Sequence, residues 1–318
     1  MTEMHPPIEP FASGLLAVSG GAEIYWEASG NPRGKPALYL HGGPGSGLGS
    51  GRYRWQFDPE TYLLLGLDQR GCGRSRPLAC DALDALQFNT TGRLIEDIEA
   101  LRRHMGIERW LVSGRSWGAT LALAYAEAHP DAVSELVLVA VTTTSRDEVM
   151  WITEGMRAIF PEAWQRLERQ SGRLQGERLI DAYARRLAAG SVEERLAAAR
   201  AWIEWEETHV SLDPNWTANA RGTDDRADLN FATLVTHYWA NDGFLRNGNE
   251  ILGRTEAIAH IPAILIHGRR DISGPAITAW KLHQQLPASR LDIVEDDGHG
   301  GPQSMQRMRA ALHLFGQA

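Results

Sequence analysis

The stretch of sequence that decides the fold is found at residues 110–123 and reads WLVSGRSWGATLAL. Its first part, Trp110–Val112, is a short apolar run typical of a buried strand, and the residues after Gly118 have the composition of a helix. Between them lies a G-x-S-x-G pattern that starts at Gly114, in the strand-to-helix context that this pattern requires. We therefore predict that Ser116 is a nucleophile, because a serine that only caps a helix would not explain both glycines.

Further apolar runs on both sides of this stretch predict a parallel sheet. They lie at Ala37–Leu40, Tyr62–Leu67, Leu136–Val141, Ala263–Ile266 and Leu291–Val294. Helical periodicity runs from Leu94 to Met105, between two of these strands. Such alternation predicts a doubly wound α/β sheet that is covered on both faces. Ahead of it, Leu15–Val18 and Ala22–Trp26 predict a hairpin.

The middle of the chain has a different character. From residue 145 to residue 254 no strand pattern is found, and stretches such as Glu177–Ala189 are rich in Ala, Leu, Glu and Arg. The segment holds six of the eleven Trp residues, namely Trp151, Trp164, Trp202, Trp205, Trp216 and Trp239. We interpret residues 145–254 as a helical cap inserted into a core formed by residues 1–144 and 255–318. These Trp side chains fill a small helical core, line a pocket against the sheet, or do both.

Composition excludes several classes of protein. The 318 residues carry a formal net charge of −8, whereas a nucleic-acid binder normally shows a basic face. No apolar run approaches the roughly 20 residues that span a bilayer. Only Cys72 and Cys80 are present, so a disulfide framework is excluded, and the His residues lack metal-ligand spacing. We expect a cytoplasmic protein without a metal or cofactor, and the oligomeric state stays open.

A serine nucleophile needs a base, and in sheets of this kind the acid and then the histidine follow the serine along the chain. Asp271 follows the strand Ala263–Ile266, and His299 follows the last strand in a Gly-rich turn. We predict that His299 is the general base and that Asp271 orients it. The alternatives are less suited: Asp292, Asp296 and Asp297 resemble solvated carboxylates, Asp242 lies in the cap, and His267 is expected to bond locally.

Two glycine-rich loops complete the expected site. The sequence HGGPGSG at residues 41–47 follows a strand, and it offers backbone N–H groups. We predict an oxyanion hole formed by the N–H groups of Gly43 and Trp117. A nucleotide-binding loop is not favoured, because the sequence fits neither of the two phosphate-binding patterns, G-x-G-x-x-G and G-x-x-x-x-G-K-[ST]. The second loop, DQRGCGRS at residues 68–75, is interpreted as a structural loop that braces the site, and Cys72 in it has no base nearby.

These motifs resemble those of the proline iminopeptidases, which are α/β-hydrolases with a helical cap. The resemblance rests on HGGPG at residues 41–45, DQRGCGRS at residues 68–75 and SWG at residues 116–118. It continues in the cap through FPEAW at residues 160–164 and HYW at residues 237–239. The resemblance covers nearly the whole chain, and it implies an α/β-hydrolase fold with a mostly parallel eight-stranded sheet.

The resemblance also implies how the substrate is recognised. In this family, acids of the cap hold the N-terminal ammonium of the peptide, and Glu206 matches the Glu of the family's Trp-Glu pair. We predict that Glu206 binds this ammonium, with Trp205 and Trp202 as substrate-binding neighbours; the alternative is that Glu206 is a solvated helix carboxylate. Val235 stands where a second acid is usual and Ser145 where a basic residue is common, so these departures affect the specificity pocket.

The sequence thus predicts a serine hydrolase that acts as an aminopeptidase, releasing proline from short peptides through an acyl-enzyme. The alternative is a carboxylesterase or amidase with the same Ser116, Asp271 and His299 but without a requirement for a free amine. A third class, a small-molecule receptor on this fold, is disfavoured by the complete set of three residues.

Overall fold

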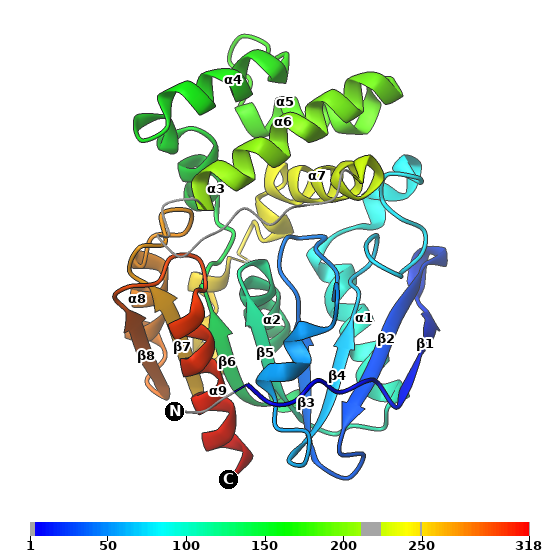
Figure 1. Ribbon diagram of the computed structural model, residues 1–318, viewed down its shortest axis with the longest axis vertical. Coiled ribbons are helices and arrows are strands. Elements are labelled where there is room, and N and C mark those ends of the chain that lie inside the picture. Colours follow the sequence, from blue (N-terminus) through cyan, green and yellow to red (C-terminus); the bar gives the residue numbers. More distant parts are fainter. Residues whose placement is uncertain (1–3, 211–223, 249, 318) are drawn as a thin grey trace.

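The structure is a computed structural model that describes residues 4–210, 224–248 and 250–317. At its centre lies an eight-stranded sheet with the strand order β1-β2-β4-β3-β5-β6-β7-β8 (Figure 1). The pairs β1–β2 and β2–β4 are antiparallel, and the other neighbours are parallel. The α/β sheet that the apolar runs predict is therefore confirmed.

The bounds of the strands extend the predicted runs by a few residues. The strands are β1 (Ala12–Ala17), β2 (Glu23–Gly30), β3 (Lys35–Leu40), β4 (Tyr62–Leu67), β5 (Trp110–Arg115), β6 (Val133–Val139), β7 (Ala263–Gly268) and β8 (Ser289–Val294). The longer helices that flank the sheet are α1 (Thr91–His104), α2 (Trp117–Ala128), α8 (Ile277–Gln285) and α9 (Pro302–Gly316). The predicted hairpin is present, since β1 and β2 pair through a turn at Ser19–Gly21.

Side chains on successive strand positions point to opposite faces of the sheet and are buried on both. In β6, Leu136 and Leu138 belong to the core under α1, α2 and α8, whereas Val137 and Val139 belong to the core under α9. Figure 1 shows α9 on one side of the sheet and α2 on the other. Burial on both faces explains why these strands read as continuous apolar runs.

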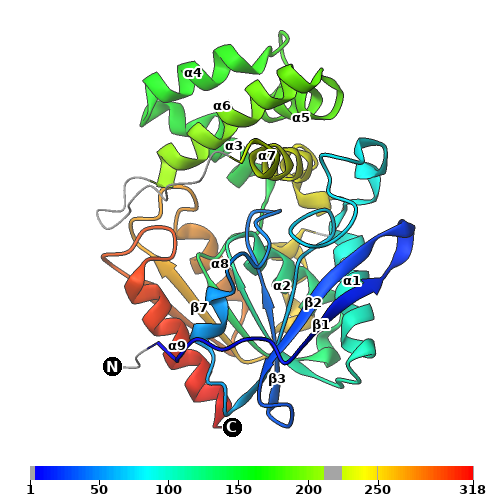
Figure 2. The same cartoon turned by 45° about the vertical axis from the view of Figure 1, so that its right-hand side comes forward.

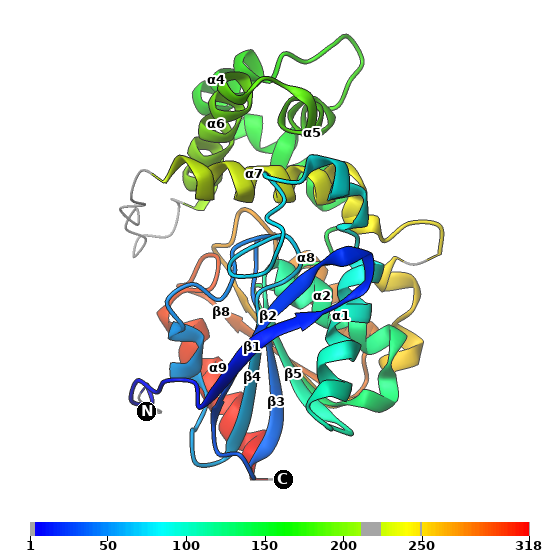
Figure 3. The same ribbon diagram turned by 90° about the vertical axis from the view of Figure 1, so that its right-hand side faces the viewer.

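Helices between β6 and β7 form a cap at one end of the sheet (Figure 2). They are α3 (Arg146–Thr153), α4 (Pro161–Ser171), α5 (Leu179–Ala189), α6 (Val192–Val210) and α7 (Asp225–Ala240). Figure 3 shows α7 next to the sheet and α4, α5 and α6 farther out. No strand occurs in the described part of residues 145–254, as the composition predicts, and Trp216 lies outside the described residues. The domain boundaries at 144 and 254 stay a prediction.

One buried carboxyl group is expected to make the stability of the fold depend on pH. Glu127 in the last turn of α2 is 4% exposed, and neither carboxyl oxygen has a hydrogen-bond partner among the described residues. Burial raises the pKa of Glu127 from 4.5 to about 8, and Arg254 opposes this only in part. Between pH 4.5 and about pH 8, the folded protein therefore binds one more proton than the unfolded chain. The free energy of unfolding falls as the pH rises through this range.

Glu127→Gln is expected to raise the free energy of unfolding by about 2–4 kcal/mol at pH 8 and by much less at pH 5. Urea unfolding at the two pH values measures this difference. Glu99→Gln is the matched control on α1, because Arg102 and Tyr125 lower the pKa of Glu99 to about 2 and the substitution should destabilise the protein at pH 8. An effect of Glu127→Gln that is equal at both pH values would contradict the assignment.

Candidate active site

The predicted nucleophile lies in a sharp turn between β5 and α2. Ser116 has φ 57° and ψ −126°, a conformation that residues with a side chain rarely adopt. The close approach of the neighbouring chain requires glycine on both sides. A Cβ atom on Gly114 would collide with the carbonyl of Gly118, and a Cβ atom on Gly118 would collide with the carbonyl of Leu40. The turn that the motif predicts is therefore present.

His299 and Asp271 meet beyond the carboxyl ends of β7 and β8. Nδ1 of His299 lies 2.7 Å from Oδ2 of Asp271, and Oδ1 of Asp271 accepts the N–H of Gly274 at 2.9 Å. Burial by itself would raise the pKa of Asp271, but the His299 ring and this N–H lower it below its ordinary value. Asp271 is therefore a carboxylate, and Nε2 of His299 is the ring atom that can accept a proton.

The second histidine of this region has a local role, as predicted. His267 is fully buried; its Nδ1 accepts the N–H of Val141 at 3.0 Å, and its Nε2 donates to the carbonyl of Gly274 at 2.7 Å. Burial lowers the pKa of His267, so the ring is neutral. With both nitrogens engaged, His267 is not available as a base.

The alternative carboxylates are also engaged elsewhere. Asp292 and Asp296 pair with Arg290 and Arg270, each at 2.7 Å. Asp242 pairs with Arg178 and Arg246 in the cap at 3.1 and 2.9 Å. The expectation that Asp297 is solvated is wrong, because this residue is 1% exposed and accepts the N–H of Ser304 in the first turn of α9. A carboxylate at the start of a helix satisfies N–H groups that lack a partner within the helix.

The loop after β3 is held against α2 by one side chain of the second Gly-rich loop. Gln69 donates from its side chain to the carbonyl of His41 at 2.8 Å and from its backbone to Nε2 of His41 at 3.0 Å. Its side-chain oxygen accepts the indole N–H of Trp117 at 2.9 Å. The second loop thus braces the site, as predicted. Trp117 is the first residue of α2, so its backbone N–H has no helix carbonyl to bond.

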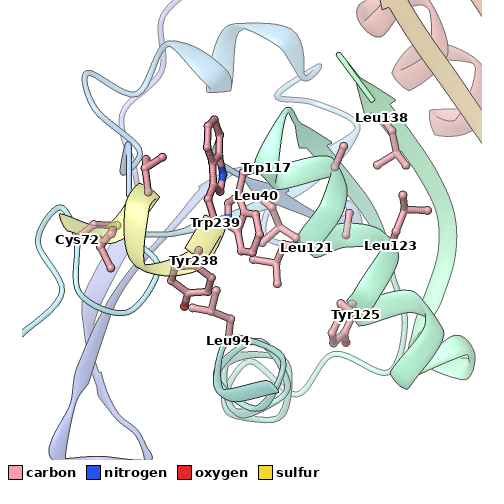
Figure 4. Packing of buried hydrophobic residues seen from close by; sticks show 14 of the residues in the cluster. Leu40, Cys72, Leu94, Trp117, Leu121, Leu123, Tyr125, Leu138, Tyr238 and Trp239 are labelled. Atoms are coloured by element: carbon pink, nitrogen blue, oxygen red, sulfur yellow. The ribbon is translucent and has the colours of Figure 1, made fainter. Parts of the chain in front are cut away.

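The candidate residues converge on a cavity between sheet and cap. Ser116, His299, Gly43 and Trp117 all line it, and Asp271 lies behind His299. The remaining residues that line it are Thr142, Thr144, Glu148, Val149, Ile152, Trp239, Ser273 and Gly274. Figure 4 shows Trp117 of α2 next to Tyr238 and Trp239 of α7, and the ring centroids of Trp117 and Tyr238 are 4.9 Å apart.

The three predicted substrate-binding residues of the cap lie together on α6. Trp202 and Trp205 are fully buried, and the ring of Trp202 is 5.7 Å from that of Trp239, centroid to centroid. Glu206 accepts the indole N–H of Trp202 at 3.1 Å and lies 3.6 Å from Nε2 of His209. None of the three is among the described residues that line the cavity. Their contact with substrate therefore stays a prediction.

Some residues at this site have no counterpart in the sequence-based set. Arg115 donates from Nη2 to the carbonyl of His299 and so links the nucleophile turn to the histidine loop; its place inside the G-x-S-x-G motif was the available signal. Thr142 and Glu148 line the cavity. The Ser145-x-x-Glu148 pattern is a capping box, which predicts the start of α3 but does not show that the helix opens on the site.

Residues 35–301 match the family described as the alpha/beta hydrolase fold. The chain therefore belongs to the α/β-hydrolases, the class that the sheet and the Ser116 turn also define. It is 43% identical over 298 residues to a proline iminopeptidase of Arabidopsis thaliana, with 93% of this chain and 77% of that protein covered. It is 40% identical over 318 residues to a proline iminopeptidase of Xylella fastidiosa, with 99% and 100% covered. Within the α/β-hydrolases, the chain belongs to the proline iminopeptidase family.

A solved structure gives independent support for the fold. The crystal structure of a proline iminopeptidase of Mycobacterium smegmatis superposes with a TM-score of 0.62 at 19% identity, and 96% of this chain and 98% of that chain are covered. At this level of identity the likeness concerns the fold alone. Within the described residues, no helix has both the length and the apolar character needed to cross a membrane.

Proposed function

We propose that this protein is a serine hydrolase that releases an N-terminal residue, above all proline, from short peptides through an acyl-enzyme. The observation that carries the proposal is that Ser116 and His299 line one cavity, with the buried Asp271 on the other ring nitrogen of His299. Membership of the proline iminopeptidase family supports the choice of substrate.

The chemistry follows from these positions. Oγ of Ser116 attacks the carbonyl carbon of the first residue while Nε2 of His299 accepts the hydroxyl proton, and Asp271 stabilises the imidazolium. The N–H groups of Gly43 and Trp117 meet the negative charge that develops on the carbonyl oxygen. The C–N bond breaks, and His299 gives its proton to the leaving amine. Water, deprotonated by His299, then attacks the ester at Ser116; the ester bond breaks, His299 returns the proton to Oγ of Ser116, and the acid is released.

The lining of the cavity favours the end of a peptide over its middle. The cap bounds the cavity through Val149 and Ile152 of α3 and Trp239 of α7. A chain cut internally must continue on both sides of the scissile bond, whereas these cap side chains bound the cavity on one side. The apolar side chains of this wall are suited to the ring of proline.

The proposal is tested by comparing a prolyl arylamide with its N-acetylated counterpart and with a neutral acyl ester. An aminopeptidase should cleave the free-amine substrate with a kcat/KM at least a hundredfold above that of the acetylated one. Similar rates for both amides, or efficient cleavage of the ester alone, would favour the alternative, a carboxylesterase or amidase with the same three catalytic residues.

The cap acid is tested separately. Glu206→Gln is expected to lower kcat/KM for the prolyl arylamide at least tenfold relative to the neutral ester, because losing a charged hydrogen bond in a complex costs about 2–5 kcal/mol. Glu204→Gln is the matched control on the same helix, since Glu204 pairs with Arg166 at the surface. Equal losses for ester and amide in the Glu206 variant would show that this residue does not recognise the amine.

We also propose a cytoplasmic location and a small peptide or ester as the substrate. The proposal on location is supported by Cys72 and Cys80, both of which are free thiols in the fold. Such thiols are typical of reducing compartments.

A further inference from the structure

One wall of the active-site cavity carries polar side chains that the catalytic chemistry does not use. Thr142, Thr144 and Glu148 line the cavity together with Ser116 and His299. The two threonines follow β6, and Glu148 is the third residue of α3. This wall therefore lies where the chain passes from the sheet into the cap.

The carboxylate of Glu148 is held by neutral donors. Its Oε1 accepts the hydroxyls of Thr142 at 3.0 Å and of Thr278 at 2.8 Å. Its Oε2 accepts the N–H and hydroxyl of Thr143 at 3.1 and 2.7 Å, and those of Ser145 at 3.0 and 3.1 Å. Within the described part of the chain, no Lys or Arg hydrogen bonds to it. These dipoles fix the carboxylate in place but leave its negative charge uncancelled.

The donor and acceptor roles of the wall hydroxyls can be assigned, because each threonine hydroxyl has only one proton to donate. Thr142 donates its proton to Glu148. Thr120 donates its proton to the carbonyl of Thr142 at 2.9 Å. Since Oγ1 of Thr144 lies 2.9 Å from Oγ1 of Thr120, Thr144 must be the donor between them. The hydroxyls of Thr142 and Thr144, which line the cavity, therefore both donate to groups of the protein. Toward a substrate they can only accept hydrogen bonds.

A wall of acceptor oxygens next to a negative charge is complementary to a positively charged donor. We infer that Thr142, Thr144 and Glu148 receive the protonated amine of the substrate's first residue, an inference that rests on the proposed aminopeptidase function. The N–H₂⁺ group of an N-terminal proline carries two protons, one for each threonine oxygen. Thr142 keeps a lone pair for this, although it also accepts the N–H of Thr144 at 3.2 Å. Glu148 supplies the charge through its hydrogen bond with Thr142.

The amine of the first residue is separated from the scissile carbonyl by one carbon atom, so at least one of the groups that bind it is expected in the wall of the cavity that Ser116 lines, beside the proposed contact with Glu206 of the cap. Thr142, Thr144 and Glu148 meet this requirement. Val235, which stands where the family has a second acid, is fully buried in α7 and offers no charge. Glu148 supplies the missing negative charge from α3, at the junction of sheet and cap.

A purely structural role for Glu148 is the competing explanation, because this residue also forms the capping box of α3 with Ser145. Substitutions of two threonines distinguish this structural role from a role in binding the amine. Thr142 and Thr278 both donate to Oε1 of Glu148, but of the two only Thr142 lines the cavity. Valine keeps the shape of threonine and removes the hydroxyl. Thr142→Val and Thr278→Val therefore make a matched pair.

The measured quantity is the ratio of kcat/KM for a prolyl arylamide to kcat/KM for a neutral acyl ester. Thr142→Val is expected to lower this ratio at least tenfold through a higher KM for the amide, and Thr142→Ser, which keeps the hydroxyl, should restore it. Thr278→Val should keep the ratio within about twofold of the wild type. Stoichiometric labelling of Ser116 by a small phosphonate shows that each variant is folded.

Three results would overturn the inference. If Thr142→Val and Thr278→Val change the ratio equally, the wall only stabilises α3. If the wild-type protein shows no preference for a free amine, the aminopeptidase function and this inference fail together. A wild type that prefers the free amine, combined with an unchanged ratio in Thr142→Val, overturns the inference alone.

Discussion

Ser116→Ala is expected to lower kcat for the prolyl arylamide by about 10⁴-fold or more, since the members of a serine triad act as a unit and no partial substitute for the nucleophile remains. The variant should also lose its covalent reaction with serine-directed phosphonates. Mass spectrometry of the labelled wild type should map a single adduct to the peptide that contains Ser116. Both losses follow from the position of Ser116 at the tip of the turn between β5 and α2.

Ser113→Ala is the matched control for this experiment. Ser113 lies three residues earlier on β5, is fully buried and donates to the carbonyl of Val137 at 3.0 Å, and it is not among the residues that line the cavity. This variant should still be labelled. Unchanged turnover by a folded Ser116→Ala protein would refute the assignment of the nucleophile.

Asp271→Asn is expected to lower kcat by about 10³- to 10⁴-fold with little change in KM. The amide can donate to Nδ1 of His299, which forces the ring proton onto Nε2, the atom that has to accept the proton of Ser116. Because the residues act as a unit, adding Asp271→Asn to Ser116→Ala should cause no further loss. Steady-state kinetics of the two single variants and the double variant measure this.

The control for the acid is Asp297→Asn. Asp297 is as buried as Asp271 and lies close to His299 in the sequence, but it accepts the N–H of Ser304. Its substitution should lower the thermal stability and leave the triad geometry intact. A larger loss of kcat in Asp297→Asn than in Asp271→Asn would mean that the orienting carboxylate is assigned to the wrong residue.

Much of this fold could be predicted from short stretches, because strands that are buried on both faces must be apolar along their whole length. Tyr62–Leu67 is such a run, and β4 has these same bounds. The strand ends do not follow from the side-chain pattern: β5 continues to Arg115 because its backbone still pairs with β6 there. The burial of Asp297 was also missed. An acidic residue in a turn is usually solvated, but here the first turn of α9 packs against Asp297 and donates the N–H of Ser304 to it.

What the sequence by itself determined is the nucleophile turn, the order of Ser116, Asp271 and His299, and the helical character of the cap. Each of these depends on a local pattern, such as glycines that permit close approach of the backbone or a Gly-rich turn after a strand. What only the tertiary structure decided is the chemistry of the cavity wall. The direction of the Thr144 proton depends on Thr120, which lies 24 residues away on α2. The charge of Glu148 is held in part by Thr278, 130 residues away on α8. A hydroxyl can donate or accept, and its role is settled only when distant parts of the chain have packed around it.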